Sequence, residues 1–196
     1  MASPPNPYAG MKHPSREIVS EYLDYDPQTG VFRWKQLAAY RRKPGEIAGA
    51  VRNSGRDKTG HRHINIFGHR YPATHIAWLL MTGEWPSRQI DHKNNIGTDD
   101  RWTNLRLATQ LQNIMNNSVR SDNTSGYKGV HPYKRGKRSK WVTQIGDRHI
   151  GYFQTAEEAA RAYDREAIKT FGEFAYLNFP DDDGGGKPVE RHVHVR

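Results

Sequence analysis

The stretch from Ile90 to Asn113 constrains this chain most, because it places a small set of polar side chains at fixed intervals between short apolar segments. Asp91 and His92 are adjacent, Asn104 follows His92 by twelve residues, and Asn113 follows Asn104 by nine. A carboxylate, an imidazole and two amides can supply a general base, a group that orients the base, and oxygen ligands for a divalent cation. The pattern therefore indicates a metal-dependent centre that hydrolyses phosphodiesters.

Local patterns around these residues predict a strand, a second strand and then a helix. Residues 89–92 and the alternating residues 104–107 are typical of a half-buried hairpin with a long loop between its strands. Thr109 and Gln112 have the spacing of a capping box, so a helix should begin there and carry Asn113 in its first turns. A simpler interpretation stays open, since Asn and Asp are common in turns and caps for local hydrogen-bonding reasons.

With these spacings the stretch resembles the HNH endonuclease family, in the homing or phage type whose first metal ligand is Asp and whose last motif residue is Asn. By position, the resemblance implies that Asp91 and Asn113 hold the metal. It also makes His92 the general base and Asn104 the residue that orients His92. Two oxygen ligands suit Mg²⁺ or Mn²⁺, one cation per site, better than zinc. The turn Asp26-Pro27-Gln28-Thr29-Gly30 also opens many phage members of this family.

Other histidines lie before the motif. His75 occupies the place of the first His of the family motif, at the start of an apolar helix predicted over residues 73–81, and we interpret it as a supporting residue. His61, His63 and His69 fall within one predicted hairpin, but no carboxylate sits at matching spacing. We therefore interpret these three as surface imidazoles near DNA phosphate rather than as a metal site.

A second pattern begins after a segment rich in Asn and Ser. Strands are predicted over residues 127–133, 140–145 and 149–153. A helix follows, with a capping box at Thr155 and Glu158 and a stripe of small residues that ends at Gly172. Because small alanines let a helix lie close to a sheet, this stripe is interpreted as core packing.

Several short motifs in this second part resemble the Apetala-two, or ethylene-response-factor, DNA-binding domain: Ser125-Gly126-Tyr127-Lys128-Gly129-Val130, Gly151-Tyr152-Phe153, the run 155–160, and Leu177-Asn178-Phe179. The resemblance implies a three-stranded sheet that lays one face in the DNA major groove while a helix packs behind it. By position it makes six residues candidates for contact with bases or phosphates: Lys128, His131, Tyr133, Gln144, Arg148 and His149.

Charge along the same strands adds further DNA-binding candidates. From Lys128 to Arg148 the chain has seven basic residues and one acid, with Tyr133 and Trp141 interleaved among them. Such a surface suits the phosphate backbone. The candidates from this run are Lys134, Arg135, Lys137, Arg138 and Lys140. A solvated charged loop is the alternative interpretation.

Composition limits the class of protein. The 196 residues carry a net charge of +9, which favours a polyanionic partner, although ribosomal and membrane-surface proteins have similar totals. With no cysteine, disulfides and cysteine-ligated zinc are excluded. A hydrophobic content of 35% without a long apolar run, and a polar, Pro-rich N-terminus, predict no membrane segment and no signal peptide. A cytoplasmic protein, encoded by a phage and acting in the bacterial host, is expected.

These observations lead to one overall prediction, an α+β protein in which an HNH ββα-metal nuclease domain precedes a three-stranded antiparallel sheet packed on one helix. The predicted parts are a disordered leader (1–14), the HNH domain (15–116), a linker (117–126), the Apetala-two-like domain (127–180) and a disordered tail (181–196). The predicted function is metal-dependent cleavage of double-stranded DNA, by a monomer that nicks one strand or by a dimer, with no small-molecule substrate. An inactive DNA-binding regulator and a nucleic-acid packaging protein are the alternatives.

Overall fold

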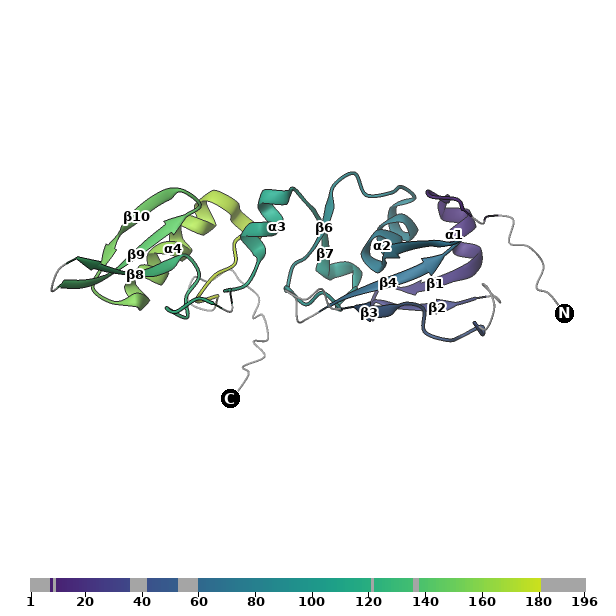
Figure 1. Cartoon of the computed structure of the whole chain (residues 1–196). Coiled ribbons are helices and arrows are strands. Elements are labelled where there is room, and N and C mark those ends of the chain that lie inside the picture. The colour runs from purple at the N-terminus through teal and green to yellow at the C-terminus, as the bar shows by residue number, and fades with distance from the viewer. Residues whose placement is uncertain are drawn as a thin grey trace. The chain divides into compact units, whose positions relative to one another are not determined.

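The computed structural model describes residues 8, 10–35, 42–52, 60–120, 122–135 and 138–180. The chain divides into two units, Met1–Thr109 and Gln110–Arg196 (Figure 1). Both mix helices and strands, so the predicted α+β class is confirmed. The division falls directly before the helix that carries Asn113, whereas the linker is predicted at 117–126.

The first unit is a set of short antiparallel hairpins around one central helix. Its described residues form three sheets, with strand orders β1-β2, β3-β4-β5 and β6-β7. Its elements are α1 (Arg16–Tyr22), β1 (Leu23–Asp26), β2 (Val31–Trp34), β3 (Ala50–Arg52), β4 (His61–Ile66), β5 (His69–Pro72), α2 (Ala73–Thr82), β6 (Gln89–His92), the 3₁₀ helix η1 (Trp102–Asn104) and β7 (Leu105–Ala108). The predicted hairpin over 89–107 is thus present as β6 and β7.

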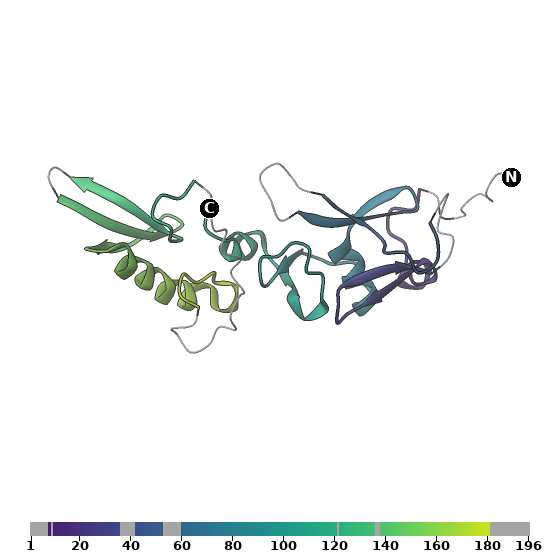
Figure 2. The same cartoon turned by 90° about the horizontal axis from the view of Figure 1, so that it is seen from below.

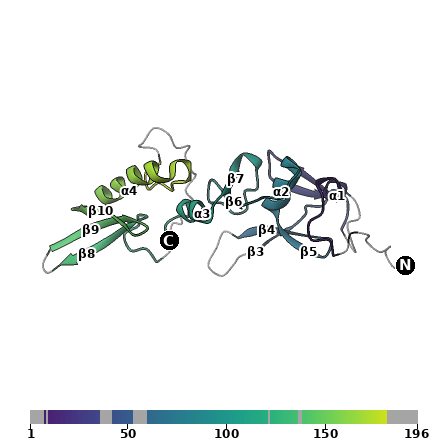
Figure 3. The same cartoon turned by 90° about the horizontal axis from the view of Figure 1, so that it is seen from above.

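Helix α2 lies at the centre of the first unit, where it contacts α1, β4 and β5 (Figure 3). It is apolar on most of its surface, as its sequence predicts, and Ile76 and Leu79 are almost fully buried against Leu23, Phe32 and Ile64. Gly83, in the left-handed conformation at φ 88°, ends the helix and bonds its N–H to the Leu79 carbonyl. The two-residue turn between β4 and β5 has positive φ at both positions, which matches the twist of a tight hairpin.

Part of the predicted leader packs onto this core. Tyr8 makes edge-on ring contacts with Tyr22 and Phe67, and Pro14 is fully buried. The Tyr71 hydroxyl donates to the Lys12 carbonyl at 2.6 Å. Residues 10–14 are therefore tied to the unit by aromatic packing and backbone hydrogen bonds. Residues 1–7 and 9 of the predicted leader lie outside the described part of the chain.

The second unit consists of one antiparallel sheet, in the order β10-β9-β8, with one long helix against it. Its elements are α3 (Gln110–Asn116), β8 (Val130–Arg135), β9 (Arg138–Ile145), β10 (Arg148–Phe153), α4 (Ala156–Phe171) and the 3₁₀ helix η2 (Gly172–Phe174). Helix α4 runs along one face of the sheet and contacts all three strands (Figure 2). The predicted three-stranded sheet packed on one helix is confirmed.

Helix α4 shows how local sequence produces this packing. The predicted capping box is formed, with the Thr155 side chain and the Glu158 side chain each bonded to the other residue's backbone N–H. The alanine stripe is buried against the sheet, with Ala159 and Ala160 at 0% exposure. Buried Asp164 accepts hydrogen bonds from Asn178 and from the Phe179 N–H, and so ties the segment after the helix to the unit. The predicted tail, 181–196, lies outside the described residues.

Candidate active site and nucleic-acid face

The candidate catalytic residues lie at the end of β6. Register pairs Asp91 with Arg106 and His92 with Leu105 on β7. Both Asp91 and His92 are buried, at 3% and 7% exposure, although adjacent residues of a strand point to opposite sides. The Arg106 guanidinium donates to the Asp91 carboxylate at 2.8 Å. The end of β6 is therefore covered on both faces, and each polar side chain there has a charged neighbour.

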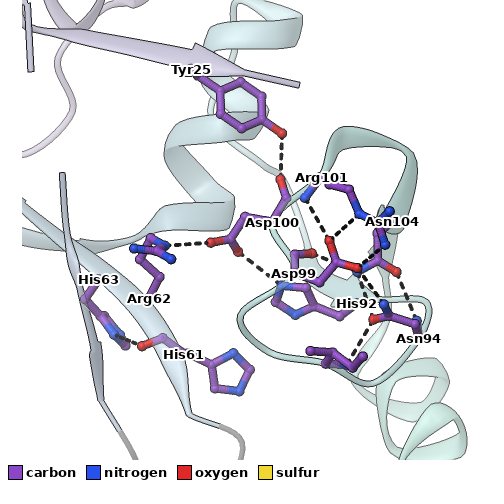
Figure 4. Close-up of polar contacts among 11 residues, drawn as sticks. Tyr25, His61, Arg62, His63, His92, Asn94, Asp99, Asp100, Arg101 and Asn104 are labelled. Carbon is purple, nitrogen blue, oxygen red and sulfur yellow. Dashed lines mark hydrogen bonds and ion pairs between the residues drawn. The ribbon is translucent and has the colours of Figure 1, made fainter. Parts of the chain in front are cut away.

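His92 contacts a carboxylate that the sequence pattern does not single out. Its Nε2 lies 3.2 Å from Oδ1 of Asp100, a residue of the loop between β6 and β7 that is 1% exposed (Figure 4). The other carboxylate oxygen of Asp100 lies 3.4 Å from Nε of Arg62, which comes from β4. Residues from a strand, a loop and a second sheet thus form one chain of charged and polar groups that ends at the imidazole.

The backbone around Asp100 is held by the hairpin of β1 and β2. The Tyr25 hydroxyl donates to the Asp100 carbonyl at 2.7 Å, and burial, together with the charge of Asp100, raises the pKa of Tyr25 well above its usual range. The hydroxyl therefore keeps its proton and stays a donor. At the tip of the hairpin, Gly30 has φ +72° and a Cβ there would lie 2.6 Å from the Arg101 nitrogen. The Asp-Pro-x-Thr-Gly turn thus packs closely against the backbone at Asp100 and Arg101.

Asn104, predicted to orient His92, bonds instead to the loop. Its amide oxygen accepts from the Asn94 N–H, and its NH₂ group donates to the Asn94 side chain and to the Asp99 carbonyl. Asp99 in turn pairs with Arg101, whose hydrogen bond lowers the pKa of Asp99. The side-chain bonds of Asn104 therefore shape the loop that presents Asp100, and Asp100 lies at hydrogen-bond distance from Nε2 of His92.

The two remaining motif residues, Asn113 and His75, lie on helices. Asn113 is on α3, which begins the second unit, so its assignment as a metal ligand with Asp91 stays a prediction. His75 is half-buried on α2, and burial lowers its pKa. Among the described residues no hydrogen bond or ion pair of His75 occurs, so its supporting assignment also stays a prediction.

One histidine interpreted from sequence as a surface group lies beside His92. The ring of His61, on β4, is exposed and has its centroid 5.6 Å from the His92 ring. Gly97 makes room for it, because a Cβ at that position would lie 2.7 Å from the His61 ring. His61 precedes His92 by more than 30 residues on another sheet, so spacing within the motif carries no signal of the contact.

Across the described part of the chain, no group of three or more His, Asp or Glu side chains is arranged to hold a metal ion. The predicted site has two protein ligands, one carboxylate and one amide, so it is smaller than the groups of three or more that this statement covers. No helix among the described residues has the length and apolar character needed to cross a membrane.

In the second unit, the sheet face opposite α4 carries several of the predicted DNA contacts. The register sets His131, Val142 and Tyr152 in one row across the three strands. Tyr152, which is 50% exposed, contacts the rings of Tyr133 and His149 at centroid distances of 4.9 and 4.7 Å. Tyr152 is not among the residues predicted from sequence, although its alternation with the core residue Phe153 places it on this outer face.

Two predicted DNA contacts have charged groups that bond to other residues of the second unit. The Lys128 ammonium donates to the carbonyls of Met115 and Asn117 and lies over the Tyr176 ring, and burial lowers the pKa of Lys128 to about 8. Arg148, whose side chain is 67% exposed, forms a surface ion pair with Glu166 of α4 at 2.9 Å.

The structure describes the side chains of some of the other predicted DNA contacts and not of the rest. His131, Lys134, Gln144 and His149 are exposed, and Tyr133 and Lys140 are partly exposed. Arg135 and Arg138 lie on β8 and β9 with their side chains outside the description, and Lys137 lies outside the described residues altogether.

Comparison with known proteins now adds to this geometry. Residues 71–115 match the HNH endonuclease family. This match contains α2, β6, β7 and nearly all of α3, and therefore the Asp91–His92 pair, Asn104 and Asn113. An "uncharacterized HNH endonuclease" of Acanthamoeba polyphaga mimivirus is 35% identical over 105 residues, which make up 53% of this chain and 54% of the viral protein. The chain thus spans about half the length of this relative.

The C-terminal part is similar to plant proteins. Dehydration-responsive element-binding protein 2E of Arabidopsis thaliana is 58% identical over 44 residues, covering 22% of this chain and 18% of that protein. Protein 1J of the same name in Oryza sativa subsp. indica is 42% identical over 62 residues, covering 28% and 25%. No solved structure matches the chain. The predicted resemblance of one part to HNH endonucleases and of the other to Apetala-two-type proteins is confirmed.

Proposed function

We propose that this chain is a metal-dependent DNA endonuclease, in which the first unit cuts and the second unit holds the DNA. The observation that carries the proposal is the buried His92, whose Nε2 lies 3.2 Å from buried Asp100 inside the segment that matches the HNH endonuclease family. A buried imidazole with a carboxylate on one nitrogen and a carboxylate residue next to it in sequence is suited to proton transfer.

The metal of such a site would be held by Asp91 and, through the resemblance, by Asn113. The donor chemistry fits, because carboxylate and amide oxygens suit the hard cations Mg²⁺ and Mn²⁺. One oxygen of Asp91 accepts from Arg106 at 2.8 Å, which holds the carboxylate in one orientation. When bound, the cation would stabilise negative charge on the phosphate and on the leaving oxygen.

The residues of this chain supply the proton transfer. His92 would take a proton from the attacking water, and burial around it limits competing solvent. One such centre acts on one strand, so we propose that a monomer nicks DNA and that a double-strand break requires a dimer or two successive cuts. The family type that the motif resembles suggests a phage homing enzyme acting in the bacterial cytoplasm, and this setting is part of the proposal.

The second unit is proposed to hold DNA with the sheet face opposite α4. Its exposed residues include His131, Gln144 and His149, with Tyr133, Lys140 and Tyr152 beside them. Cationic and aromatic side chains on a sheet can contact phosphates and bases. We exclude Lys128 from this face because its ammonium bonds to carbonyls within the unit. Arg148 forms an ion pair with Glu166 of α4 but is exposed, so it stays a proposed phosphate contact. The similarity to plant proteins named for binding a dehydration-responsive element supports DNA as the partner.

A plasmid assay tests the proposal. Supercoiled plasmid is incubated with the purified full chain in Mg²⁺ or Mn²⁺, with a parallel reaction containing a chelator. The expected product is nicked circles that form with the metal and not with the chelator. The assay is repeated on a panel of plasmids with varied sequence. If every plasmid stays supercoiled with each metal while binding shifts its mobility on the gel, the result contradicts the nuclease and favours a DNA-binding regulator.

A further inference from the structure

We infer that Asp100 is the positioning residue of this centre, fixing the orientation of the His92 ring and placing the ring proton on Nε2. The inference rests on the proposed function, which assigns His92 the task of a base, and it names the group that prepares His92 for that task. Sequence and family resemblance assign the orienting task to Asn104, whose side-chain bonds go to Asn94 and Asp99.

The contact itself determines which nitrogen carries the proton. An ionised carboxylate accepts hydrogen bonds and donates none, so the ring nitrogen at 3.2 Å from Asp100 must be the one that bears hydrogen. In the neutral ring the other nitrogen, Nδ1, then has the basic lone pair. Asp100 therefore makes Nδ1 the nitrogen that would act as the base in the proposed function.

Asp100 is itself fixed from three directions. Arg62 lies at 3.4 Å from its second carboxylate oxygen, and Tyr25 donates to its carbonyl. Gly30 lets the neighbouring hairpin approach its backbone closely. A buried carboxylate is costly unless a cation lies close to it, and Arg62 supplies that charge as an ion pair without a hydrogen bond, while Tyr25 and Gly30 fix the Asp100 backbone. Because Asp100 is fixed in this way, its carboxylate can hold the His92 ring in one orientation.

Arg62 makes the consequence of Asp100→Asn predictable. The Arg62 guanidinium donates and cannot accept, so an amide at position 100 will turn its oxygen toward Arg62. Its NH₂ group then faces Nε2 of His92, which must become an acceptor. The variant should therefore move the neutral ring proton to Nδ1 and remove the basic lone pair from the atom that needs it.

The decisive measurement is the tautomer of neutral His92, read from ¹⁵N chemical shifts and two-bond ¹H–¹⁵N couplings of the full chain, without DNA or metal. Wild type should show hydrogen on Nε2, and Asp100→Asn should show hydrogen on Nδ1. Asp99→Asn is the matched control, because this adjacent carboxylate bonds to Arg101 and Asn94. It should perturb the loop and keep the wild-type tautomer.

Cleavage gives a second readout. Asp100→Asn should lower the single-turnover nicking rate by about 10²- to 10⁴-fold, the range typical of a misdirected or missing base. Its DNA affinity should stay within about twofold of wild type, as expected when a group acts in the transition state and not in binding. A residue that served only to hold the fold would lower both together, along with the melting temperature.

The outcomes separate this inference from the proposed function. Hydrogen on Nδ1 in wild type, or an unchanged tautomer in folded Asp100→Asn, overturns the inference even if the protein cuts DNA. If Asp100→Asn does not fold, the wild-type tautomer still decides. The predicted tautomers in a protein that cuts no DNA would uphold the positioning role of Asp100 and contradict the nuclease.

Discussion

The two units place their functional groups in opposite environments. In the first, His92, Asp91 and Asp100 are each less than one tenth exposed and are bonded to charged partners. In the second, the groups assigned to DNA lie on an open sheet face, with Tyr152 half exposed. Proton transfer needs one imidazole in one orientation, which burial and hydrogen bonds provide. Holding a long polyanion needs many modest contacts that solvent can reach.

This difference predicts how each unit responds to substitution. In the first unit the side chains form a connected network from β4 through Asp100 to β6, so a single change should affect catalysis strongly. In the second unit the contacts are spread over three strands, so a single change should weaken binding partially.

The largest effect is expected from His92→Ala. Removal of the proposed general base should lower the nicking rate by at least about 10²-fold, since such groups typically contribute 10²- to 10⁴-fold. DNA affinity, measured by fluorescence anisotropy, should change by less than about twofold because the proposed binding face is in the other unit. Equal loss of rate and affinity would mean that the division of labour between the units is wrong.

A backbone test of the same region is Gly30→Ala. The new Cβ would lie 2.6 Å from backbone atoms of Asp100 and Arg101, and the residue has φ +72°. The free energy of unfolding of the first unit should fall by about 2 kcal/mol or more, and the nicking rate should fall with it.

Gly83→Ala is the matched control for that substitution. Gly83 also has positive φ, at +88°, but a Cβ there meets nothing within 4 Å. Its cost should be limited to about 1–2 kcal/mol for the left-handed backbone. Urea unfolding followed by tryptophan fluorescence measures the stability of both variants. If Gly30→Ala and Gly83→Ala lose similar amounts of stability and nicking rate, the close approach of Gly30 to the Asp100 backbone is not needed to position Asp100.

On the binding side, Lys140 and Lys128 should behave differently although sequence assigns both to DNA. Lys140→Gln should weaken DNA binding severalfold and reduce the slope of log affinity against log salt by about one. Lys128→Gln should leave that slope unchanged, because the Lys128 ammonium bonds to carbonyls of its own unit. Anisotropy titrations at four salt concentrations measure the slopes, and a decrease for Lys128→Gln would return that residue to the DNA face.

These cases show what the sequence can predict. Local patterns identify the β6–β7 hairpin, the buried α2 and the capped α4, because caps, turns and periodicity act over a few residues. The adjacent Asp91 and His92 are likewise recognisable from spacing.

Contacts between distant segments are what the sequence leaves out. Asp100 meets Arg62 and Tyr25, residues 38 and 75 positions away, because three hairpins converge on one loop. Nothing in the spacing of the motif records that convergence. The assignment of Lys128 to DNA has a related origin, since a basic residue looks the same in sequence whether its ammonium lies in solvent or lies over the Tyr176 ring.

The smallest expected effect concerns Lys128 and pH. Burial lowers its pKa from 10.5 to about 8 in the folded protein, so between these values the unfolded chain binds more protons. The stability of the second unit should therefore rise as pH increases from about 8 toward 10, and below pH 8 the cost of burying the charge is fully present. Burial raises the pKa of Tyr163 to about 12, which lowers stability only above about pH 10, the ordinary pKa of Tyr.

Urea unfolding at pH 7.5 and 9.5, followed through the methyl signals of Ala159 and Ala160, isolates the second unit. Wild type should be more stable at pH 9.5, and Lys128→Met should lose that difference because it has no ammonium to bury. If Lys128→Met keeps the same pH dependence, the Lys128 ammonium is solvated in the folded protein and does not make the contacts described above. Lys128 and Lys140 would then no longer differ in their availability for DNA.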